Sequence, residues 1–157
     1  FITAGAAESV LPEAAVPDAQ EIEDLATERA VVEGGAAALA AERATAEQCA
    51  LLESIVAGMV GLQPFEQWSE RDALLHLVIG DASGSPRLVA RIADLRAEAY
   101  RISRVLPTTA EVLAIADREH GEIVRAIVAR KPERARTLME GHVRGTARLQ
   151  AGLGRVT

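Results

Sequence analysis

Four side chains of this sequence could together bind a divalent metal ion: Asp72, His76, His120 and His142. They include all three histidines of the chain. Asp72 and His76 are four residues apart, so on an α-helix they lie on the same face, one turn from each other. Imidazole nitrogens and a carboxylate oxygen suit zinc best, and they also suit nickel, manganese or iron.

Each of these residues lies in line with an apolar face of a predicted helix. The face that holds Asp72 and His76 is formed by Phe65, Trp68, Leu75, Ile79 and Ala82. The face around His120 is formed by Leu113, Ala116, Ile123 and Ile127, and the face around His142 by Ala135, Leu138, Gly145 and Leu149. A buried carboxylate without a partner is costly or becomes protonated. One such histidine alone is more often a hydrogen-bonded core residue, but the four together favour a shared metal site.

Arg29 also occupies an inward position, on an earlier helix, with Glu33 one turn later. Its guanidinium could face the same cavity and bind an anionic ligand through two hydrogen bonds. It could equally form a surface ion pair with Glu33, worth a few tenths of a kcal/mol. Thr146, one turn after His142, could offer its hydroxyl to a ligand, although such a threonine more often bonds its own helix backbone.

The elements that must position these side chains are all predicted to be helices. Val and Ile recur at helical rather than alternating spacing, and aromatic residues make up only 3 % of the chain. Asp18 and Thr45 are candidate N-caps for the first two helices, and a threonine at 108 or 109 for the fifth. The six helices are expected at about 18–43, 45–58, 64–83, 86–106, 109–129 and 132–152. The predicted fold is all-α, an antiparallel bundle of about six to seven helices with a metal site in its core.

Composition limits the class of protein further. A chain of 157 residues is long enough for one domain with a sizeable core. Its single cysteine, Cys49, is predicted to be a buried thiol, which suits a reducing cytoplasm. The sequence has no apolar run of membrane-spanning length, so we expect a soluble protein without membrane contact. The net charge of −6 argues against DNA binding by this stretch itself.

Three segments resemble a known family, the FCD effector-binding domain of FadR-type GntR transcription regulators. The segments are RAVVEGGAAALAAERAT (29–45), DALLHLVIGDASGSPRL (72–88) and EHGEIVRAIVARKPERARTLMEGH (119–142). The resemblance spans about residues 20–150. It implies that Asp72, His76, His120 and His142 are the metal ligands, and that Arg29 and Glu33 match the family's early arginine and glutamate. Leu75 and Ser85 depart from the family, which usually has an aromatic residue and often an asparagine there.

The resemblance also suggests a domain organisation. Residues 18–157 would form the effector-binding and dimerisation domain, so a homodimer is expected. Residues 1–17, which begin Phe1-Ile2-Thr3, would be the remnant of a wing and a linker from a missing N-terminal winged helix-turn-helix. DNA would then be bound through that missing domain and not through this fragment.

The resemblance implies a sensor rather than an enzyme, in which a small carboxylate effector completes the coordination of the metal and modulates DNA binding. A long-chain acyl-CoA sensor is a second possibility within the family, but such domains lack the full metal set. A metal-dependent hydrolase would need a general base near the metal. Glu119 is the nearest candidate in sequence, yet neighbours on a helix point about 100° apart, so Glu119 is predicted to face away. A purely structural metal bundle is the remaining alternative.

Overall fold

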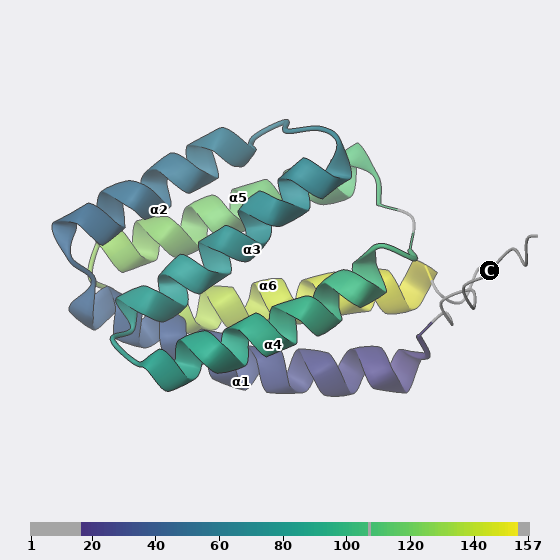
Figure 1. The fold of residues 1–157 in the computed structure, drawn as a ribbon, viewed down its shortest axis with the longest axis horizontal. Coiled ribbons are helices and arrows are strands. Elements are labelled where there is room, and N and C mark those ends of the chain that lie inside the picture. Colours follow the sequence, from purple (N-terminus) through teal and green to yellow (C-terminus); the bar gives the residue numbers. More distant parts are fainter. Residues whose placement is uncertain (1–16, 107, 154–157) are drawn as a thin grey trace, which may run out of the picture.

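The computed structural model describes residues 17–106 and 108–153 (Figure 1). Within these ranges every regular element is an α-helix, which confirms the predicted all-α class. The helices are α1 (Ala19–Arg43), α2 (Ala46–Met59), α3 (Phe65–Ala82), α4 (Pro86–Ser103), α5 (Ala110–Val128) and α6 (Pro132–Leu153). None of them is both long and apolar enough to cross a membrane. Residues 1–16 of the predicted linker lie outside the described residues.

The helices begin where the capping residues predict. The Asp18 carboxylate accepts a hydrogen bond from the Glu21 amide at 2.8 Å, and the Thr109 hydroxyl accepts one from the start of α5. Thr45 and Gln48 form a reciprocal capping box at the start of α2. Such caps satisfy amide groups that have no partner inside the helix, and each stabilises the helix by about 1 kcal/mol.

Helix α1 packs against α3, α4, α5 and α6, most extensively against α6. Its buried positions are therefore spread around most of the helix rather than along one stripe. Most are alanines, and Ala36, Ala37, Ala40 and Ala41 are completely buried. Such small side chains let the neighbouring helices approach α1 closely, which gathers their side chains around one core.

Two details of the predicted core are wrong. Cys49 is half-buried rather than buried. The buried face of α6 runs through Ala135, Met139, His142, Val143 and Ala147, whereas Leu138 is half-buried and Leu149 is 41 % exposed. The reason is that α6 packs against both α1 and α5, so the buried stripe follows the groove between them rather than a line of leucines.

Candidate metal centre

The four predicted ligands meet inside the bundle. Asp72 and His76 come from α3, His120 from α5 and His142 from α6, and all four are buried. One ligand atom from each lies within 4.8 Å of all the others. Helices far apart in the sequence thus bring together one carboxylate oxygen and three imidazole nitrogens, so these side chains can hold a metal ion.

The separations of these atoms fit a metal site. His120 Nε2 lies 3.1 Å from His142 Nε2 and 3.2 Å from Asp72 Oδ1, and His76 Nε2 lies 3.4 Å from the same oxygen. With metal–nitrogen bonds of about 2.0–2.1 Å, neighbouring ligands of a tetrahedral ion are about 3.3 Å apart. Asp72 Oδ1 and His76 Nε2 are also buried without a hydrogen-bond partner among the described residues. A cation would satisfy these atoms, since buried polar groups otherwise find partners.

Two glutamates turn histidine nitrogens toward this centre. His76 Nδ1 contacts Glu33 Oε2 of α1, and His142 Nδ1 lies 2.7 Å from Glu119 Oε2 of α5. A carboxylate at Nδ1 favours a proton on that nitrogen, which leaves the Nε2 lone pair free for a metal. Both imidazoles are therefore held in the tautomer that metal binding needs.

His120 is positioned differently, by an aromatic neighbour. The Trp68 ring stacks on it with centroids 6.0 Å apart, and the indole nitrogen of Trp68 donates a hydrogen bond to Asp117 at 2.8 Å. Asp117 and His120 both belong to α5. Trp68 thus restrains the His120 ring through packing.

The carboxylate of Asp72 is shared between the centre and an arginine. Its Oδ2 atom accepts a hydrogen bond from Arg96 of α4, while Oδ1 faces the histidines. Burial, reinforced by the charge of Arg29, lowers the pKa of Arg96 to about 9, so this guanidinium is still protonated at neutral pH. A positive charge beside a carboxylate favours its ionised form, which is the form that binds a metal.

Arg29 and Glu33 do form the predicted pair, but it is buried rather than on the surface. Arg29 Nε donates to Glu33 Oε1 at 2.6 Å, and the two side chains are only 7 % and 1 % exposed. Burial raises the pKa of Glu33, but the charges of Arg29 and His76 outweigh it and hold the pKa well below the ordinary value. Arg29 Nη2 is buried and has no hydrogen-bond partner among the described residues. The guanidinium therefore keeps a donor for an anion.

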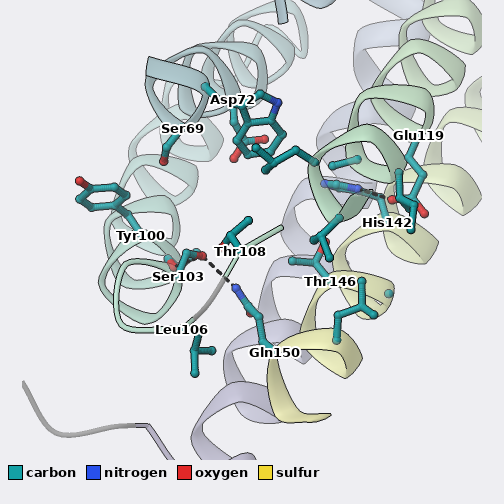
Figure 2. Close-up of a pocket in the computed structure, with 18 of the residues that line it drawn as sticks. Ser69, Asp72, Tyr100, Ser103, Leu106, Thr108, Glu119, His142, Thr146 and Gln150 are labelled. Atoms are coloured by element: carbon teal, nitrogen blue, oxygen red, sulfur yellow. Dashed lines mark hydrogen bonds and ion pairs between the residues drawn. The ribbon is translucent and has the colours of Figure 1, made fainter. Parts of the chain in front are cut away.

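A cavity of about 350 Å³ opens beside the centre (Figure 2). Arg29, Asp72, Arg96 and His142 line it, and Thr146 lies on its wall one turn from His142. This volume lies within the range of small-molecule sites. A ligand in the cavity would thus reach the predicted metal ligands and the free donor of Arg29.

Two residues that contact the candidate ligands are not predicted from the sequence. Glu119 was predicted to face away, but its side chain reaches across to His142, because α5 packs directly against α6. Position 119 is four residues before the buried Ile123, which could have placed it near the core. Arg96 was not singled out, although it is four residues after the buried Ile92 on the inward face of α4. An arginine at such a position predicts a buried anionic partner.

Burial keeps two of the histidines neutral. Burial and then the charge of His76 lower the pKa of His120 from 6.5 to about 3. Burial and then the charge of His120 lower the pKa of His142 well below its ordinary value. Neutral imidazole is the form that coordinates a metal.

We therefore expect the metal-free protein to lose stability as the pH falls below about 6.5. His120 takes up a proton near pH 6.5 in the unfolded chain, but only near pH 3 in the folded protein. The unfolded state then binds more protons, so the free energy of unfolding falls by about 2 kcal/mol between pH 7 and pH 5 from His120 alone. His142 contributes in the same direction.

Urea unfolding in the presence of EDTA at pH 7, 6 and 5 measures the free energy of unfolding as a function of pH. The His120→Gln variant should show a weaker dependence on pH. A wild-type profile that is flat over this range would contradict buried, neutral histidines.

Glu119→Ala should weaken Zn²⁺ binding about 10- to 100-fold, the usual effect of removing the hydrogen-bond partner of a ligating histidine. Glu119→Gln, which keeps an acceptor oxygen, should lose less. The matched control is Glu122→Ala, an exposed glutamate on the same helix. Competition against a chromophoric chelator gives the affinities. Equal affinities for Glu119→Ala and Glu122→Ala would show that Glu119 does not support His142.

The structure is thus an all-α domain with a buried group of one aspartate and three histidines beside a cavity. Residues 13–145 match the FCD domain family. The chain therefore belongs to the FCD domain family, which confirms the resemblance to the effector domains of GntR-type regulators.

Two known proteins place this similarity in context. RmpR of Mycobacterium gastri, named as an HTH-type transcriptional regulator, is 31 % identical over 126 residues, which cover 79 % of this chain and 46 % of that protein. The chain thus spans about half the length of this relative. The structure of E. coli McbR/YncC has a TM-score of 0.70 over 90 % of this chain and 68 % of that chain. At 18 % identity, this second similarity concerns the fold alone.

Proposed function

We propose that this FCD domain is the effector sensor of a GntR-type transcription regulator, and that it binds a divalent metal ion and a small carboxylate. The observation that carries the proposal is the convergence of Asp72, His76, His120 and His142 at one end of a cavity that Arg29 also lines. Zinc is the first expectation, since one oxygen and three nitrogens suit it well.

Different residues of this chain would bind the metal ion and the carboxylate. Asp72 and the three histidines hold the ion, which when bound supplies a positive charge that attracts a carboxylate oxygen. The free Nη2 donor of Arg29 binds the carboxylate through a charge-assisted hydrogen bond. Thr146 adds a hydroxyl from the wall of the cavity. The effector would thus bridge α1 and the three helices that hold the metal.

The regulatory output would lie outside this domain. The relative in M. gastri is named as an HTH-type regulator, and this chain covers only 46 % of it. With its net charge of −6, the domain itself is a poor match for a phosphate backbone. We propose that effector binding shifts the arrangement of paired DNA-binding domains in a homodimer.

The test combines metal analysis with carboxylate titration. The purified protein should contain one divalent ion per chain, and EDTA should remove it. Lactate and acetate should then bind to the Zn²⁺-loaded protein and not to the EDTA-treated protein in calorimetry. Stoichiometric metal without any carboxylate binding would favour a purely structural ion, whereas absence of metal binding would overturn the proposal.

A further inference from the structure

Several buried side-chain atoms at the metal end of the cavity have no hydrogen-bond partner in the part of the chain that the structure describes. Among the described residues, the buried side-chain atoms without a partner are Arg29 Nη2, Asp72 Oδ1, His76 Nε2, Arg96 Nε and His120 Nδ1. All five belong to the candidate metal centre or to the arginines beside it. A ligand therefore needs a charged, hydrogen-bonding head at this end.

Two polar side chains at the end of the cavity away from Asp72 and His142 already pair with each other. Figure 2 shows Ser103 and Gln150 joined to each other well away from Asp72 and His142. Gln150 Nε2 donates to Ser103 Oγ at 2.8 Å, and Ser103 Oγ donates to the Ala99 carbonyl at 2.9 Å. A ligand hydroxyl that displaced one of these bonds to make its own would bring little net gain.

Between the two ends, apolar side chains form much of the wall. They come from α3, α5, α6 and the segment after α4: Phe65, Trp68, Leu106, Leu113, Ala116 and Leu149.

Three large side chains of the cavity wall are unusually exposed. Tyr100, Ile115 and Leu149 are 41 %, 37 % and 41 % exposed. Because all three line the cavity, part of their exposed surface faces the space that a ligand would fill. Covering such surface is favourable for an apolar ligand, at about 25 cal/mol per Å².

We infer that the effector is a carboxylate with an apolar body, rather than a polyhydroxylated acid, an inference that rests on the proposed function. Its head binds at Arg29 and the metal end, and its body lies along the apolar wall toward Ser103 and Gln150. The cavity of about 350 Å³ has room for a body of several carbons beyond the carboxylate.

The test uses two acids with six carbons each, hexanoate and gluconate, titrated into the Zn²⁺-loaded protein. Hexanoate should bind more tightly, although gluconate carries five hydroxyls and can chelate through its α-hydroxyl. Within the series acetate, butyrate and hexanoate, affinity should rise about fourfold for each added methylene, the equivalent of about 0.8 kcal/mol. Tighter binding of gluconate, or an affinity independent of chain length, would overturn the inference and leave the proposed function standing.

A matched pair of variants locates the apolar body. Leu149→Gln alters the cavity wall at an exposed position, so the fold should persist. It should weaken hexanoate binding about fourfold or more, as expected for one or two methylenes that lose apolar contact, and leave acetate binding unchanged. The control is Leu51→Gln on α2, at a leucine that is 47 % exposed and does not line the cavity. Equal hexanoate affinities for the two variants would place the body elsewhere and overturn the inference.

The carboxylate titrations give different results if only the apolar body is wrong and if the proposed sensor function is wrong. If acetate, hexanoate and gluconate all fail to bind the Zn²⁺-loaded protein, the sensor function fails and the inference fails with it. If acetate binds but longer chains gain nothing, only the apolar body is wrong.

Discussion

Replacement of His142 by alanine is expected to abolish the stabilisation that Zn²⁺ gives to the wild-type domain. The predicted ligands come from α3, α5 and α6, so a bound ion crosslinks three helices. When free Zn²⁺ is a thousandfold above its dissociation constant, binding to the folded state alone adds about 4 kcal/mol. For a domain of this size, 1 kcal/mol shifts Tm by about 2–4 °C, so EDTA should lower the wild-type Tm by about 10 °C.

The informative quantity is the difference between the Tm values in Zn²⁺ and in EDTA, measured for each variant. This difference removes any effect that the substitution has on the metal-free fold. His120→Ala should behave like His142→Ala, while Thr146→Ala, which changes the cavity wall one turn away, should keep the full shift. Should both histidine variants retain one Zn²⁺ per chain and the wild-type shift, the histidines are core residues and the metal centre does not exist.

The helices could be predicted because residues close in sequence to each helix end determine where that helix begins or ends. Asp18, Thr45 and Thr109 cap helices through their own side chains, and Pro86 stands at the first position of α4. Each of these signals acts within one helical turn, so no knowledge of the tertiary fold is needed. The buried face of α6 was less predictable, because it depends on which helices α6 packs against.

In the candidate site, too, local sequence predicts some features and helix packing determines others. Helical periodicity placed all four candidate ligands on inward faces, and the structure brings them together. Their supporting partners depend on how two helices pack. Glu119 reaches His142 only because α5 and α6 lie side by side, and Arg96 reaches Asp72 only because α4 packs on α3. An angle of 100° between neighbours on a helix does not exclude a long side chain from a site on an adjacent helix.

Arg29 shows why two interpretations of one residue could not be separated by sequence. The i and i+4 spacing correctly predicts the pair with Glu33, and the inward position correctly predicts the contact with the cavity. Only the three-dimensional arrangement shows that Arg29 Nε donates a hydrogen bond to Glu33, while Nη2 has no partner among the described residues. A guanidinium can serve both groups at once because its five donors point in different directions.

Removal of the Arg29 side chain is therefore expected to weaken carboxylate binding far more than metal binding. Losing a buried charge-assisted partner costs about 2–4 kcal/mol, which is about a 30- to 900-fold loss of affinity. Arg29→Lys should lose much of the affinity too, because one ammonium group cannot present a planar fork to Glu33 and to a ligand together. Both variants should still bind one Zn²⁺ per chain, since no ligand atom of the centre belongs to Arg29.

The measurement is calorimetry of Zn²⁺-loaded protein with whichever of lactate, gluconate and hexanoate binds the wild type most tightly. Arg91→Ala is the matched control, because Arg91 also pairs with a glutamate of α1, Glu28, but does so on the surface. That variant should bind the carboxylate like the wild type. The Zn²⁺ content of each protein is measured in parallel, so a loss of carboxylate binding can be assigned to Arg29 and not to a lost metal. If Arg29→Ala and Arg91→Ala bind the carboxylate equally well, Arg29 serves only to neutralise Glu33 beneath His76, and the anion is held by the metal alone.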